Sequence, residues 1–179
     1  MPPRLHNNLL KAAALFFISY GIFLVIWIQI KGQYGAVLLS VVSNVIGLFT
    51  HAAYVDVHRE HDMFTVVFGS LRDKGRAIPM SINAFTYNMP IALAILAALT
   101  PFIKRKKRAL TEAVSFLILS HILYVTTLET LSFTLENHTI LHAINEYAFL
   151  FMHKVMTRSE PFIIGAYILA VYVYRDESY

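Results

Sequence analysis

The stretch RAIPMSINAFTYNMPIALAILAALTPFIKRKKR, residues 76–108, decides how this chain meets a membrane. A polar and aromatic neck at residues 81–88 leads into Pro90, and an apolar run follows over residues 91–103. Proline fits the first turn of a helix, and Asn88 is placed to cap that turn. Five cations end the run and are expected to stay in cytoplasmic water: Lys104, Arg105, Lys106, Lys107 and Arg108. The stretch therefore predicts a span that crosses inward from the outer face.

The composition indicates an integral membrane protein. Hydrophobic residues make up 57% of the 179 residues, charged residues 15%, and the mean hydropathy is +0.57. Soluble domains have about 45–50% apolar and about 25% charged residues. The net charge of +4 does not indicate nucleic-acid binding, because five of the 15 cations lie in the single run at 104–108. Cysteine is absent from the sequence, which excludes disulfides and thiolate metal sites.

We predict a mainly α-helical protein with four membrane spans and a small extracytoplasmic cap. The spans are expected at residues 10–30, 84–103, 109–128 and 161–174, with a basic cytoplasmic loop at 104–108. The first apolar run is long for a signal peptide, so we interpret it as an uncleaved anchor. With four spans, every large excess of Lys and Arg falls on one side. Both termini are therefore expected in the cytoplasm, most simply of a bacterial inner membrane.

The cap is predicted at residues 32–82. Its apolar first part, residues 36–50, carries serines and an asparagine, which favours an interfacial or re-entrant helix. The β-branched and aromatic residues near 54–68 surround a polar centre and predict a β-hairpin. A second outer element, an amphipathic helix, is expected at residues 129–160. Ser159 and Pro161 then resemble the start of the last span.

The neck also carries a family resemblance. Asn83, Phe85, Tyr87, Pro90 and the apolar run at 92–99 follow a pattern of the type N-P-L-x-Y-x-x-x-x-P-L-x-L-A-L. With the hairpin and the basic loop on either side, residues 15–130 resemble the exosortase H-associated membrane proteins, and Trp27 and the hydrophobic hairpin at 55–67 also occupy family-like places.

The chain departs from that pattern at two positions. Ala84 stands where the pattern has proline, and Asn88 is an additional polar residue before Met89 and Pro90. The resemblance implies an accessory of an exosortase, a membrane enzyme that processes proteins with C-terminal sorting signals. It carries over no catalytic residue and no cofactor.

The eight histidines raise the question of a metal site. His138, His142 and Glu146 would share one face of a helix, and three such ligands can hold zinc or non-haem iron. The alternative is that they are hydrated interfacial residues, since no H-E-x-x-H motif is present.

Two ionisable residues fall inside the third predicted span. Glu112 is placed to pair with Arg108 one helical turn away. His121 lies deeper in the span. One interpretation is a neutral imidazole that bonds to a hydroxyl such as that of Ser120 or Ser19, and the other is a proton relay or an intersubunit contact.

The neck and the hairpin are the sharpest functional candidates. We expect a partner to dock on the outer face at Asn83, Tyr87, Asn88, Arg59 and His61, with capping and interfacial anchoring as the simpler alternative. The predicted function is a non-enzymatic accessory or assembly subunit in contact with membrane lipids and another membrane protein. The alternatives are a structural subunit of a larger membrane complex, and a small membrane enzyme or metal protein that uses outer His and Glu residues.

Overall fold

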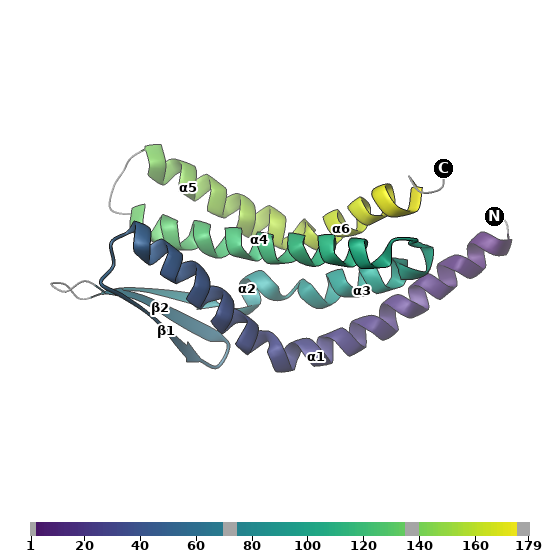
Figure 1. Ribbon diagram of the computed structural model, residues 1–179, viewed down its shortest axis with the longest axis horizontal. Helices are drawn as coiled ribbons and strands as arrows, with labels where there is room; N and C mark the ends of the chain where they lie inside the picture. The colour runs from purple at the N-terminus through teal and green to yellow at the C-terminus, as the bar shows by residue number, and fades with distance from the viewer. Residues whose placement is uncertain (1–2, 70–74, 135–139, 175–179) are drawn as a thin grey trace. The chain divides into compact units, whose positions relative to one another are not determined.

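The computed structural model describes residues 3–69, 75–134 and 140–174, and it is mainly helical with one small β-sheet (Figure 1). The chain divides into two compact units. The first, the terminal unit, comprises residues 1–29, 88–118 and 159–179. The second, the sheet unit, comprises residues 30–87 and 119–158.

Helix α1 runs without a break from Pro3 to Phe49. No break therefore separates the predicted span at 10–30 from the apolar part at 36–50, and the prediction of a separate interfacial or re-entrant helix there is wrong. The second half of α1 also contains Gly32, Gly35 and Gly47, and each glycine costs a helix about 1 kcal/mol. Packing of the second half of α1 on the sheet offsets that cost.

Three helical segments are long and apolar enough to cross a membrane: Leu10–Phe49, Asn83–Phe102 and Lys106–Thr134. They include the first three predicted spans. The 84–103 segment consists of α2 (Asn83–Thr86), α3 (Met89–Leu99) and a 3₁₀ turn (Thr100–Phe102). Asn88 precedes α3 as predicted, but its side chain makes no capping hydrogen bond to the helix.

Helix α4 spans Lys106–Thr134. It begins inside the predicted basic loop, so Lys106, Lys107 and Arg108 form its first turn. It also extends six residues beyond the predicted end at 128, because Glu129 is accommodated in the protein interior.

The region 129–160 is not one amphipathic helix. Helix α5 (Ile140–Phe151) is followed by a π-helical segment (Met152–Met156), α6 (Thr157–Ile168) and a second π-helical segment (Leu169–Tyr174). Pro161 lies inside α6 and does not start a new helix. The helix begins at Thr157 and continues through the proline.

The predicted hairpin is present, and a third strand extends it to an antiparallel sheet of order β1-β2-β3. The strands are β1 (Tyr54–Glu60), β2 (Met63–Gly69) and β3 (Arg76–Ser81). Glu60 pairs with Met63 across a two-residue turn, and Met63 pairs with Ser81. The third strand was not predicted because it contains Pro79, which lacks a ladder donor. β3 is an edge strand, where proline is tolerated.

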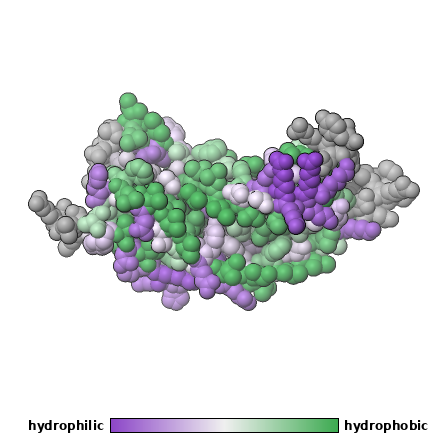
Figure 2. Space-filling view, viewed as in Figure 1, coloured by the Kyte–Doolittle hydropathy of each residue, from purple (hydrophilic) through white to green (hydrophobic). Residues whose placement is uncertain are grey.

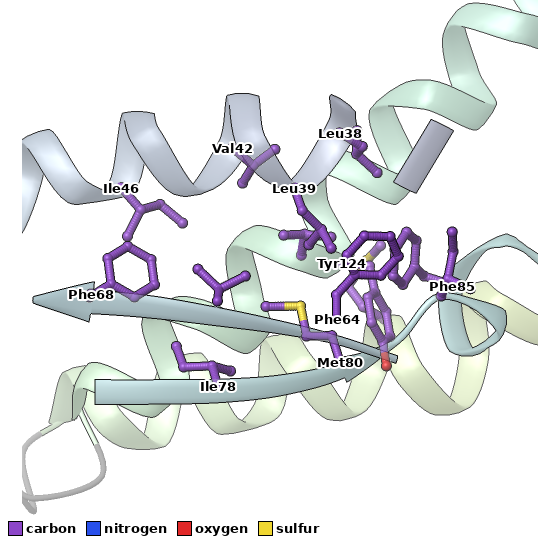
Figure 3. Packing of buried hydrophobic residues seen from close by; sticks show 14 residues of the cluster. Leu38, Leu39, Val42, Ile46, Phe64, Phe68, Ile78, Met80, Phe85 and Tyr124 are labelled. Carbon is purple, nitrogen blue, oxygen red and sulfur yellow. The ribbon is translucent and has the colours of Figure 1, made fainter. Parts of the chain in front are cut away.

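One face of this sheet is buried, and its residues meet α1 in the core of the sheet unit (Figure 3). Phe64, Val66 and Phe68 alternate along β2 with less buried residues, which is the pattern of a sheet covered on one side. Other members of the core come from α1 and α4: Leu38, Leu39, Val42, Ile46, Tyr124 and Val125. The core thus joins two helices and a sheet that are far apart in the sequence.

Large apolar side chains remain exposed over much of the molecule (Figure 2). Along α1, exposed residues include Phe17 at 71% and Ile18 at 63%. Hydrocarbon is the environment in which such a helix surface is stable, because soluble proteins rarely expose large contiguous apolar patches.

Candidate partner-docking site

A polar cluster joins the neck to the tip of the hairpin. Lys31, near the middle of α1, donates to Asp62 Oδ2 at 2.7 Å and to Asn83 Oδ1 at 3.2 Å. Asn83 Nδ2 donates to the same Asp62 oxygen at 3.2 Å. The backbone N–H of Ile82 also donates to the Asp62 carbonyl at 3.1 Å. We call Lys31, Asp62 and Asn83 the latch.

The latch favours the ionised form of Asp62. Its hydrogen bonds from Lys31 and then from Asn83 favour the charged form, and they hold the pKa of the Asp62 carboxyl below its ordinary value. Asp62 is half-exposed, with 48% of its side chain accessible, whereas the Lys31 side chain is 17% accessible. The ion pair therefore neutralises the charge of Lys31, whose side chain is largely covered and which follows nineteen uncharged residues of α1.

Two of the predicted docking residues lie at this hairpin tip. Arg59 and His61 are both exposed, and the Arg59 Nε donates to the His61 carbonyl at 3.0 Å. The Arg59 guanidinium also lies 5.8 Å from the centre of the Phe64 ring, within the range of a cation–π contact. His61 has a φ of 55°, the left-handed region that costs a non-glycine residue about 1–2 kcal/mol.

The other two predicted docking residues, Tyr87 and Asn88, do not take part in the latch. Tyr87 is 45% exposed, and its hydroxyl donates to the Thr157 carbonyl at 2.8 Å. Asn88 is 2% exposed, so its side chain is not available to a partner at the surface. Of the predicted docking residues, the structure therefore brings together Asn83, Arg59 and His61.

The five cations all lie at the surface. Lys104 and Arg105 precede α4, and the other three form its first turn. Arg108 Nε is 2.8 Å from Glu112 Oε1, which confirms the predicted pair one turn apart. The other Glu112 oxygen accepts from the Tyr167 and Tyr172 hydroxyls at 2.7 and 2.6 Å, which the sequence did not predict.

The weak metal candidates do not form a site within the part of the chain that the structure describes. In that part, no three His, Cys, Asp or Glu residues are placed to hold a metal ion. His142 Nδ1 lies 3.4 Å from the Thr134 hydroxyl, and Glu146 is exposed. His138 lies outside the described residues.

Two polar pairs join α1 to α4, and one of them is fully buried. The Tyr34 hydroxyl lies 2.7 Å from His121 Nδ1, so a tyrosine bonds the histidine for which Ser120 or Ser19 was expected. The Ser43 hydroxyl donates to Glu129 Oε1 at 2.6 Å, and both side chains are fully buried. Glu129 Oε2 has no hydrogen-bond partner among the described residues.

Lys31 and Asp62 were missed as parts of the site. A lone lysine after a long uncharged run is expected to lie at the water boundary or to pair with a carboxylate, and this signal could have indicated a partner on the hairpin. Which carboxylate supplies it is decided by the fold, since Lys31 and Asp62 are 31 positions apart.

Comparison with known proteins gives no match for this chain among family models, curated proteins or solved structures.

Proposed function

We propose that this chain is a non-enzymatic accessory subunit of an integral membrane complex, and that it docks a partner through the hairpin tip. The observation that carries the proposal is the latch. It fixes Asn83 and the turn residue Asp62 beside a charged anchor in α1, and the exposed Arg59 and His61 bond to each other next to Asp62. The positive φ of His61 follows from its place in the two-residue turn between β1 and β2.

The edge of β1 extends this surface. It is an outer strand of the sheet, and its residues Tyr54, Asp56, His58 and Glu60 are exposed. A partner segment can add to such an edge through main-chain hydrogen bonds. We therefore propose strand addition at β1 together with side-chain contacts at the tip.

The proposed topology has four spans, with residues 161–174 as the fourth and the cations on the cytoplasmic side. Spacing along α1 supports the first span. Lys11 and Lys31 enclose uncharged residues over a helical rise of about 30 Å, which is the thickness of the hydrocarbon core. Lys31 would then mark the outer boundary, with the hairpin tip at the same level.

The partner that we propose is an exosortase-type membrane enzyme. Its support is the neck at Asn83, Phe85, Tyr87 and Pro90, which resembles that of the exosortase H-associated proteins. The exposed apolar surface of α1 supports a second candidate function, that of a structural subunit packed within a larger membrane complex.

The topology is tested by single-cysteine labelling, which the absence of native cysteine makes clean. In intact cells, a membrane-impermeant maleimide should label Glu60→Cys, whereas Lys104→Cys should be labelled only after permeabilisation. Labelling of position 104 in intact cells would overturn the topology.

Docking is tested by a photoreactive amino acid at position 61, with position 158 as the control. Both positions are exposed in the sheet unit. We expect position 61 to cross-link to an exosortase-type enzyme, and Arg59→Glu to reduce the yield, whereas Arg158→Glu should not. Equal yields from positions 61 and 158, or no effect of Arg59→Glu, would contradict docking at the tip. Cross-linking from position 61 to subunits of an unrelated membrane complex would favour the structural role.

A further inference from the structure

A groove in the terminal unit combines apolar walls with two lysines. Its walls come from Phe23 of α1, Leu93, Leu96 and Ala97 of α3, and Leu110 of α4, and its volume is about 260 Å³. The Thr100 hydroxyl also lines the groove, but it donates to the Leu96 carbonyl at 2.8 Å. That hydroxyl is therefore occupied by its own helix, and the walls present a largely apolar surface.

Lys106 and Lys107 belong to the same groove. Both are exposed, and within the described ranges neither has an acidic partner. The neighbouring Arg108 differs, because Glu112 already neutralises it. The groove therefore joins an apolar wall to two positive charges that remain available for an anion.

The position along the helices fixes how a ligand would lie. Lys106 and Lys107 are in the first turn of α4, and the apolar run of that helix starts directly after the cations. All three contributing helical segments are candidates to cross a membrane. A ligand must then place a hydrocarbon chain along α3 and an anionic group at the water boundary, and an anionic phospholipid has this form.

We propose that this groove is a binding site for an anionic phospholipid, with an acyl chain against Phe23, Leu93 and Ala97 and the phosphate between Lys106 and Lys107. Basic pockets between membrane helices on the cytoplasmic side recognise anionic headgroups in this way. The inference depends on the membrane location of these helices and not on docking at the hairpin tip.

The test uses the full chain purified in mild detergent. Phosphatidylglycerol should raise the midpoint of thermal unfolding and remain bound in native mass spectrometry. Phosphatidylcholine and inorganic phosphate at the same concentration should do neither. Lys106→Gln with Lys107→Gln should weaken phosphatidylglycerol binding by about tenfold or more, since each cation near an anionic surface contributes about 1 kcal/mol.

The matched control is Lys104→Gln with Arg105→Gln, which removes the same charge from cations that do not line the groove. This control should retain binding. A photoreactive acyl chain on phosphatidylglycerol should cross-link α1 near Phe23 and α3 near Leu93. Equal weakening by the two double variants, equal effects of phosphatidylcholine, or cross-links spread evenly along the helices would overturn the proposal.

Discussion

The Tyr87 hydroxyl donates a 2.8 Å hydrogen bond to the carbonyl of Thr157, the oxygen to which residue 161 would donate if it were not proline. Proline has no N–H, so the usual bond from residue i+4 cannot form at this point of α6. A side chain 70 positions away in the sequence supplies a donor in its place. The contact ties the neck to the start of α6 within the sheet unit.

This relationship predicts that Tyr87→Phe lowers the free energy of unfolding by about 1 kcal/mol. In a Pro161→Ala background, the alanine N–H can donate to the Thr157 carbonyl, and the loss caused by Tyr87→Phe should become smaller. Thermal unfolding in detergent measures the four states of this double-mutant cycle. Tyr147→Phe is the control, because the Tyr147 side chain is 74% exposed. An equal loss in both backgrounds would show that the proline is irrelevant to the contact.

A second prediction concerns two glycines of α1. A Cβ atom at Gly35 would collide with Ile82 Cδ1, and Ile82 is 1% exposed. Gly35→Ala should therefore lower the thermal midpoint although alanine favours the helix. At Gly21, no atom beyond the glycine's own stretch of helix lies within 4 Å of the position that a Cβ would take, so Gly21→Ala should raise stability by about 1 kcal/mol at most. If both substitutions raise the thermal midpoint, or both lower it, the close approach at Gly35 is not maintained in the protein.

A third prediction is a dependence of the latch on pH. The pKa of Asp62 is lowered in the folded protein. As the pH falls below about 4, the unfolded chain therefore binds more protons than the folded chain does. The contribution of the latch to the free energy of unfolding is therefore complete above the ordinary pKa of aspartate. It is lost as the pH falls through the lower pKa that Asp62 has in the folded protein. The difference in thermal midpoint between wild type and Asp62→Asn should be constant near neutrality and shrink below about pH 4. A difference that grows on acidification would contradict the role of the ionised carboxylate.

The fourth prediction concerns the buried pair of Ser43 and Glu129. Ser43→Ala removes the hydrogen bond to a fully buried carboxyl, and we expect a loss of about 1–3 kcal/mol. Replacing both residues, as Ser43→Ala with Glu129→Leu, should recover much of that loss, because no buried polar group is then left unsatisfied. Thermal unfolding of the single and double variants checks this. If the double variant is less stable than the sum of the single variants predicts, Glu129 has a further role in the fold.

Much of the fold could be predicted because its signals are local. Apolar runs and the cations at 104–108 indicate spans from hydropathy and charge alone, and the alternation around residues 54–68 indicates a hairpin. The prediction failed for α1, where serines and an asparagine suggested a separate interfacial helix, and for Pro161, which suggested a helix start. Tertiary packing overrode both: Leu39 and Val42 are buried in the core with the sheet, and the Tyr87 hydroxyl bonds the carbonyl that proline leaves.

Hydropathy and charge along the chain were enough to determine which segments are apolar enough to enter a membrane and where charge prevents it. The reason is that transfer of a side chain from water depends on its own chemistry. The local pair of Arg108 and Glu112 could be predicted, but tertiary packing settled which polar groups from distant segments meet. Lys31 with Asp62, Ser43 with Glu129 and Tyr87 with Thr157 are 31 to 86 positions apart. Each group had several possible partners in the sequence, and the packing of the helices and the sheet selected one.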